Sequence, residues 1–218
     1  MMSLDVRAFT SPEMGENAYL VRAEGSETAV VIDPGVADPV IATLRAGGLE
    51  LEAVLLTHAH VDHIMGVAAL VRETGVPVYL HPEGRALYDR AIDQAAMFGL
   101  GIEPPPSPDR ALAHGEALRL AGCDFEVRHA PGHAPGHVVL AVRGAGVAFV
   151  GDVIFQGSIG RTDLPGGDFR RLMRSIREQV LTLPDETILY PGHGPSTTVG
   201  HERVSNPFLV PDYPGGFA

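Results

Sequence analysis

The feature that most constrains this chain is a cluster of metal-capable side chains at the end of an apolar segment. The apolar run Ala53-Val54-Leu55-Leu56 predicts a buried strand, and Thr57-His58-Ala59-His60-Val61-Asp62-His63 follows it directly. His58 and His60 are two residues apart, so in extended backbone both side chains project to one face. Imidazole and carboxylate ligands suit zinc, iron or manganese better than a purely hard cation. The spacing predicts a metal-binding loop; the ordinary alternative is a loop that is histidine-rich by chance.

Three more segments carry polar residues beside glycine, after a predicted strand. They are Pro131-Gly132-His133-Ala134-Pro135-Gly136-His137, Phe149-Val150-Gly151-Asp152 and Leu189-Tyr190-Pro191-Gly192-His193-Gly194. Glycine lets the backbone approach a ligand or a metal closely. Two four- or five-coordinate metal sites need about seven protein donors and a shared water. The sequence offers seven in these stretches: His58, His60, Asp62, His63, His133, Asp152 and His193.

Composition bounds the fold and the partners. The 218 residues, of which 45% are hydrophobic, predict one domain over 1–218 with a full core. A formal net charge of −11 disfavours a nucleic-acid partner, and no apolar run reaches membrane-spanning length. The start of the chain lacks the basic and apolar regions of a signal peptide, and Cys123 is the only cysteine. We therefore expect a cytoplasmic protein, as a monomer or a small homo-oligomer.

The order of hydrophobic patterns predicts two similar halves, each with strands and helices. Strands are expected at 4–9, 17–21, 28–32, 51–56, 77–80, 118–120, 125–128, 138–142, 147–150 and 187–190. Helices are expected at 36–46, 64–74, 81–97 and 168–183, with Asp168 as an N-cap. The proline-rich segment 98–109 and the tail from Pro207 are expected to be irregular. Many strands and few helices favour two sheets packed face to face with helices outside.

These motifs resemble the metallo-β-lactamase superfamily, and within it the short, glyoxalase II-like (hydroxyacylglutathione hydrolase-like) thioesterases. Two further stretches carry the resemblance, Gly157–Asp163 and Asn206–Leu209. It implies an α/β (α+β) fold, the four-layer αββα sandwich of two mixed sheets, with a dinuclear metal site on one edge. It assigns the donors in three groups: His58, His60 and His133 to the first ion, Asp62, His63 and His193 to the second, and Asp152 to both.

The resemblance also implies an activity. Two divalent ions (zinc favoured over iron or manganese) would hold a bridging hydroxide that attacks a thioester such as S-D-lactoylglutathione, with Asp62 orienting it. Asp152 stands where true metallo-β-lactamases typically use Cys or Ser, which disfavours β-lactam hydrolysis. The printed sequence ends at Ala218, so we expect no C-terminal glutathione-binding helical domain and an altered recognition of glutathione thioesters.

Three alternatives stay open. An iron-dependent persulfide dioxygenase of the same fold would hold one iron through His58, His133 and Asp152. A lactone or ester hydrolase would keep the chemistry and change the substrate. A metal-binding scaffold without catalysis would keep the donors alone.

Residues around the donors carry further expectations. Asp33 either bonds the metal loop or forms a turn, and His137 is expected to be structural or to support a ligand. Arg161 either binds an anionic group of the substrate or pairs with Asp163 or Asp168. Phe98 is expected at the substrate entrance, with the segment 98–109 over the site. Tyr88 and Met97 are expected in the helix core, and four histidines are expected to bind no metal: His81, His114, His129 and His201.

Overall fold

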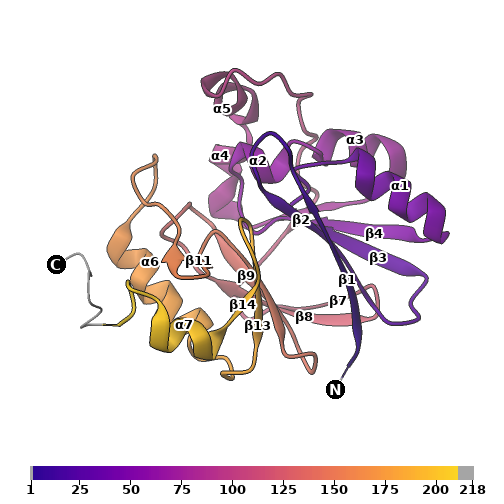
Figure 1. Cartoon of the computed structure of the whole chain (residues 1–218). Coiled ribbons are helices and arrows are strands. Elements are labelled where there is room, and N and C mark those ends of the chain that lie inside the picture. Colours follow the sequence, from indigo (N-terminus) through magenta and orange to yellow (C-terminus); the bar gives the residue numbers. More distant parts are fainter. Residues whose placement is uncertain (1, 211–218) are drawn as a thin grey trace.

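The chain folds into two six-stranded sheets packed face to face, which confirms the predicted sandwich (Figure 1). The computed structural model describes residues 2–210, so the end of the predicted irregular tail lies outside the described residues. The first sheet contains, in spatial order, β1 (Leu4–Thr10), β2 (Asn17–Ala23), β3 (Thr28–Ile32), β4 (Glu50–Leu55), β5 (Val78–Leu80) and β6 (Arg110–Ala111). The second contains β14 (Thr197–Thr198), β13 (Ile188–Pro191), β10 (Val147–Gly151), β9 (Val138–Val142), β8 (Cys123–His129) and β7 (Ala117–Leu120).

Both sheets are mixed, and the helices lie outside them. A small hairpin of β11 (Ile154–Phe155) and β12 (Ser158–Ile159) follows β10. The helical segments are α1 (Asp38–Gly47), α2 (Val61–Ile64), α3 (Val67–Thr74), the 3-10 turn η1 (Pro82–Gly84), α4 (Arg85–Tyr88), α5 (Ala91–Met97), α6 (Phe169–Ser175), the π-helical turn η2 (Ile176–Val180) and α7 (Val199–Ser205). Within the described residues, no helix is long and apolar enough to cross a bilayer.

Alternation of side chains along the strands creates three apolar layers. In β3, Val30 and Ile32 face the second sheet, whereas Val31 faces the outer helices. The central layer also contains Phe125 and Phe149 from the second sheet. The outer layers bury α1 and α3 on one side and α6 on the other. Because both faces of each sheet are covered, the central strands read as continuous apolar runs.

The predicted helix 64–74 begins earlier than expected and is interrupted. Asp62 and His63 lie in α2, and the helix breaks at Gly66 before α3 begins. The Gly66 amide donates to the Pro34 carbonyl at 2.7 Å. A Cβ on Gly66 would stand 2.6 Å from the same oxygen, so the loop after β3 contacts the chain where only glycine fits. This contact, which the local pattern does not contain, breaks the helix.

The predicted helix 81–97 is also broken, into η1, α4 and α5. The Tyr88 side chain turns into the first apolar layer, as expected, and its hydroxyl donates to the Pro106 carbonyl at 2.8 Å. Met97 is 77% exposed, so its predicted core position is wrong. The segment 98–109 is irregular, as predicted, and Asp168 caps α6 by accepting from the Arg171 amide. Helix α7 was not predicted, although Thr198 provides its N-cap.

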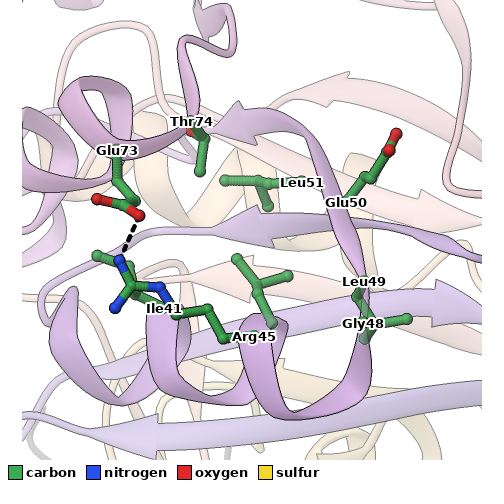
Figure 2. Close-up of a pocket in the computed structure, with 9 residues that line it drawn as sticks. Ile41, Arg45, Gly48, Leu49, Glu50, Leu51, Glu73 and Thr74 are labelled. Atoms are coloured by element: carbon green, nitrogen blue, oxygen red, sulfur yellow. Dashed lines mark hydrogen bonds and ion pairs between the residues drawn. The ribbon is translucent and has the colours of Figure 1, made fainter.

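The outer layer of the first half contains a cavity of about 470 Å³ between α1, α3 and the start of β4 (Figure 2). Ile41, Leu49 and Leu51 line it, and an ion pair between Arg45 and Glu73 crosses its side. Both charged side chains are largely exposed, so the pair contributes little to stability. Among the described residues, none of the metal-capable clusters lines this cavity.

Candidate metal centre

The metal-capable residues come from the carboxyl ends of strands in both sheets. Strands β3, β4 and β5 run parallel to one another in the first sheet, and β10 runs parallel to β13 in the second. Parallel strands of one sheet end at the same edge, so the loops after β10 and β13 lie together, and the loop after β4 contacts both of them. The loop between β8 and β9 adds His133. All seven predicted donors are brought together at this edge.

Three imidazole nitrogens converge in the first group of donors. His58 Nε2 lies 3.1 Å from His60 Nδ1, which lies 2.9 Å from His133 Nε2. A tetrahedral ion with bonds of about 2.0–2.1 Å separates its ligand atoms by roughly 3.3 Å. Small outward shifts of these rings therefore produce the geometry of a metal site. We call His58, His60 and His133 the first donor set.

The second donor set comprises Asp62, His63 and His193. Asp62 Oδ2 lies 3.1 Å from His193 Nε2 and 3.8 Å from His63 Nε2. This set mixes a carboxylate with two imidazoles, and it is more open. The His193 side chain is 31% exposed, whereas that of His63 is fully buried.

Asp152 lies between the two donor sets. Its Oδ2 is 3.5 Å from His133 Nε2 and 3.7 Å from His193 Nε2, and its Oδ1 is 3.4 Å from His63 Nε2. Asp152 Oδ1 and His63 Nε2 are buried without a hydrogen-bond partner among the described residues. Such orphaned polar atoms are costly in a protein interior, and a cation between them would satisfy both. The donor set therefore fits two divalent ions, with Asp152 able to contact both.

Burial keeps the first donor set neutral. It holds the pKa of His58 well below its ordinary value, lowers that of His60 to about 4, and lowers that of His133. A neutral imidazole offers the lone pair that a metal needs. The first donor set is thus prepared to bind a cation without releasing protons near neutral pH.

Carboxylates give the second donor set the opposite tendency. Burial disfavours a charged His63, but Asp62 and Asp152 outweigh it and raise the pKa of His63 well above its ordinary value. Burial opposes a charged His193 too, and its bond to Asp62 raises the pKa above the ordinary value. Nearby His63 keeps the pKa of Asp152 low despite burial. The field here favours a positive charge, carried by protons or by a metal ion.

Supporting contacts fix which nitrogen of each ring faces the centre. Asp33 accepts from the Thr57 amide at 2.7 Å and lies 3.1 Å from His63 Nδ1, which leaves His63 Nε2 toward the donors. Of the two readings of Asp33, the structure thus shows it bonded to the metal loop. His137 stacks on His58 at 4.5 Å, and its Nε2 accepts from the Asp152 amide at 3.1 Å. These contacts hold rings in place, as outer partners of metal ligands do.

Main-chain groups of the stretch around Gly160 complete this support. The His133 Nδ1 lies 2.8 Å from the Arg161 carbonyl, so Nδ1 carries the proton and Nε2 faces the centre. A Cβ on Gly160 would stand 1.9 Å from the Asp152 carbonyl and 3.0 Å from His133 Nδ1. The Arg161 side chain points elsewhere: it is 61% exposed and forms a two-point pair with Asp163 at 2.7 Å. The pairing expected as an alternative is present here.

The predicted substrate segment follows α5, a helix that contacts the metal loop. Phe98 ends α5 and is 55% exposed. Residues 100–103 line a cavity of about 630 Å³ together with Gly35 and Met65. Gln94 on α5 donates to the Ala59 carbonyl at 3.1 Å, which ties this helix to the metal loop. Whether the segment covers a substrate stays a prediction.

A separate cluster, His81, Glu83 and His129, lies within metal-binding distance. Its two imidazoles are parallel, with centroids 4.1 Å apart and an interplanar angle of 13°. Parallel rings cannot both direct a lone pair at one ion, and Arg171 already contacts Glu83 at 3.3 Å. That His81 and His129 bind no metal stays a prediction.

Sequence reasoning missed the residues of β2 that contact this edge. Asn17 and Tyr19 are buried and bond to the loop that carries His193. Glu16 is fully buried beside His63, and burial raises its pKa well above the ordinary value. No spacing in the sequence links these residues to a metal loop far along the chain, and their burial is visible only in the fold.

A comparison of sequences places the chain in a family. The sequence model of the Metallo-beta-lactamase superfamily matches residues 12–193. The chain belongs to the metallo-β-lactamase superfamily. It is 42% identical over 189 residues to the hydroxyacylglutathione hydrolase GloC of Haemophilus influenzae, a match that covers 85% of this chain and 89% of that protein. The superfamily binds divalent metal ions, and this member is a metallo-hydrolase.

Solved structures of the superfamily superpose on the whole sandwich. TTHA1623, in a di-iron-bound form, is 46% identical with a TM-score of 0.86, covering 94% of this chain and 100% of its own. BLEG-1, described as a B3 metallo-beta-lactamase, is 40% identical with a TM-score of 0.87, covering 95% and 100%. ETHE1 from Myxococcus xanthus is 28% identical with a TM-score of 0.77, covering 94% and 84%. The fold is shared, whereas these relatives differ in how they are described.

Proposed function

We propose that this metallo-hydrolase is a dinuclear thioesterase of the hydroxyacylglutathione hydrolase type. The observation that carries the two-ion centre is Asp152, which lies between two sets of three donors and leaves Oδ1 orphaned beside His63. The relative GloC, a hydroxyacylglutathione hydrolase by name, supports the choice of a thioester such as S-D-lactoylglutathione. TTHA1623 in its di-iron form supports two ions, and the choice among zinc, iron and manganese is left to measurement.

The proposed roles follow from the geometry. Two ions held here would lower the pKa of a bound water and polarise the thioester carbonyl. His58, His60 and His133 would hold the first ion, Asp62, His63 and His193 the second, and Asp152 both. Asp62 would also orient the attacking water, since its carboxylate lies at the open side near His193. Water adds to the carbonyl, the C–S bond breaks, and the products are a carboxylic acid and a thiol.

Two exposed side chains, those of Arg161 and Phe98, are the proposed substrate contacts. Arg161 is exposed, and its guanidinium is free to exchange Asp163 for a carboxylate of a glutathione moiety. Phe98, exposed at the end of α5, would contact an apolar part of the substrate. Both contacts are proposals for which the exposed position of the side chain is the support.

Metal content and kinetics on one preparation test the proposal. We expect about two ions per chain and turnover of S-D-lactoylglutathione that chelation removes and added zinc, iron or manganese restores. If the protein hydrolyses other thioesters but not S-D-lactoylglutathione, the proposed thioesterase reaction stands and the proposed substrate is replaced. Panels of lactones, esters and β-lactams belong in the same assay, because BLEG-1 is described as a metallo-beta-lactamase. If the metal-loaded protein hydrolyses none of these compounds, the proposal is overturned.

A mononuclear-iron persulfide dioxygenase is the second candidate, and the similarity to ETHE1 keeps it in view. It would use His58, His133 and Asp152, whose facing atoms His133 Nε2 and Asp152 Oδ2 are 3.5 Å apart. One iron per chain with oxygen uptake on glutathione persulfide would favour it. Two ions and no oxygen uptake would exclude it.

A further inference from the structure

The loop that carries His193 is held by the beginning of the chain. The Asn17 amide donates to the Gly192 carbonyl at 2.7 Å, and His193 Nδ1 lies 3.2 Å from the Gly15 carbonyl. Glu16 and His193 form an isolated antiparallel bridge. The turn between β1 and β2 therefore docks on the loop after β13, joining the two halves at the metal centre.

The Asn17 side chain grips this loop on both sides of His193. Its Nδ2 donates to the Pro191 carbonyl at 3.3 Å and to the Gly194 carbonyl at 2.9 Å. Its Oδ1 accepts from the Thr10 hydroxyl at 2.8 Å, which fixes the orientation of the amide. Only 6% of the Asn17 surface is exposed, so the loss of these bonds would leave buried polar groups without partners. The Tyr19 hydroxyl adds one more bond to the Pro191 carbonyl, at 2.7 Å.

These contacts decide which nitrogen of His193 faces the donors. A carbonyl only accepts, so Nδ1 beside the Gly15 carbonyl carries a proton. The other nitrogen, Nε2, then lies 3.1 Å from Asp62 Oδ2 and 3.7 Å from Asp152 Oδ2. His193 is the most exposed imidazole of the two donor sets, at 31%, and it lies on a loop outside any regular element. Its geometry therefore depends on the grip of its neighbours.

We propose that Asn17 is a positioning residue that sets the place and tautomer of His193, and through it the retention of the second ion. The part that concerns the ion rests on the proposed assignment of His193 to the second donor set. The part that concerns the ring does not, because Asn17 acts on the loop before any ion binds.

The variant Asn17→Asp tests the grip with almost no change in volume. It replaces the NH₂ donor by a second acceptor, which faces the carbonyls of Pro191 and Gly194. The matched control is Asn206→Asp, since Asn206 is equally buried and its Nδ2 also donates to two acceptors, the Ser158 carbonyl and Glu202. Asn206 belongs to neither donor set, so its variant reports the general cost of a buried Asn-to-Asp change.

The first readout is the imidazole of His193 in the metal-free, full-length protein. Because the bond to Asp62 raises the pKa of His193, long-range ¹H–¹⁵N spectra are recorded at alkaline pH, where the ring is neutral and its tautomer can be identified; His193→Gln assigns the signals. We expect wild type and Asn206→Asp to show a proton fixed on Nδ1. We expect Asn17→Asp to show exchange between tautomers and shifted amide signals for Gly192 and Gly194. An unchanged His193 spectrum in Asn17→Asp overturns the proposal, whatever the metal content proves to be.

The second readout is binding of zinc ions to the metal-free protein. We expect Asn17→Asp to bind the first ion as wild type does and the second roughly 10–100-fold more weakly, the usual effect of losing an outer partner of a ligand. Asn206→Asp should bind both normally even if it melts earlier. Normal binding of the second ion by Asn17→Asp contradicts the proposal. A wild type that binds one ion refutes the two-ion function instead, and the spectra still decide the role of Asn17.

If Asn17→Asp fails to fold, two milder variants test the same contacts. Tyr19→Phe removes one bond to the Pro191 carbonyl, and Thr10→Val removes the partner that orients the Asn17 amide. Both are expected to loosen the second ion less than Asn17→Asp while leaving the first unchanged. If both leave the second ion and the His193 spectrum at wild-type values, the loop does not depend on this grip.

Discussion

The two donor sets at one edge of the sandwich differ in charge, exposure and support. The first set holds three imidazoles that burial keeps neutral. The second mixes Asp62 with two imidazoles whose pKa values are raised by carboxylates. Each set draws two of its three members from the stretch 57–63; the third member is the buried His133 in the first set and the more exposed His193 in the second. The first set is thus neutral and ready for a metal, whereas in the second set protons compete with a metal.

This difference predicts an order of events. The first ion should bind more tightly and at lower pH, since neutral imidazoles need no deprotonation. The second should be the exchangeable one, because His193 is the most exposed imidazole of the two sets. Four experiments can break or sharpen the contrast between the two sets.

The largest effect is expected from Asp152→Ala, which removes the carboxylate that lies between the two sets. Loss of an ion removes several kcal/mol of transition-state stabilisation, so kcat/KM should fall on the order of 10³-fold. Metal analysis should show fewer ions per chain. The control is Asp185→Ala, a carboxylate 66% exposed and paired with Arg203, which should leave both quantities unchanged. Two tightly held ions in Asp152→Ala would show that the sets do not share it.

Next in size is the contrast between His133→Ala and His193→Ala. The first variant loses a buried ligand of the proposed tight site, and the second loses the exposed ligand of the weaker one. We expect His193→Ala to keep one ion and His133→Ala to lose the tight one, which calorimetric titration with zinc resolves. Equal losses in both variants would remove the proposed hierarchy.

Lowering the pH should separate the two ions by affinity. An ordinary histidine has a pKa near 6.5. The pKa values of His63 and His193 are raised, so these two residues gain protons at a higher pH than an ordinary histidine does. Each proton that competes with the metal weakens binding by up to about tenfold per pH unit. His58, His60 and His133 have lowered pKa values and stay deprotonated to more acidic pH. Zinc content measured during acid titration should fall in two steps, and a single step would contradict the assignment.

The smallest of the four effects concerns Arg161, whose main-chain carbonyl and side chain have different roles. Its carbonyl supports His133, and its side chain reaches Asp163. Arg161→Ala keeps the carbonyl, so metal content should stay normal while KM for S-D-lactoylglutathione rises about 3–10-fold from a lost charged hydrogen bond. Asp163→Asn frees the guanidinium and should not raise KM. If the kinetics of Arg161→Ala are unchanged, the Arg161 side chain does not bind the substrate and only pairs with Asp163.

Much of this fold can be predicted from local sequence patterns. The strand before Thr57, the layers of alternating apolar residues and the cap at Asp168 all appear as local patterns, and the structure contains each. Errors arose where tertiary contacts overrode local ones. Gly66 breaks a helix because the Pro34 carbonyl meets it there, and Met97 is exposed although its neighbours predicted a core helix.

The sequence by itself indicated the seven candidate donors: four by their spacing within the stretch 57–63, and three by their place beside glycine after a predicted strand. Only the tertiary structure decided how each donor is aimed. The supports are main-chain carbonyls at Arg161 and Gly15 and an asparagine from β2, and a carbonyl has the same chemistry in every residue. Every residue has a main-chain carbonyl, so the sequence does not show which carbonyl supports an imidazole. Only the fold shows which carbonyl lies beside the ring.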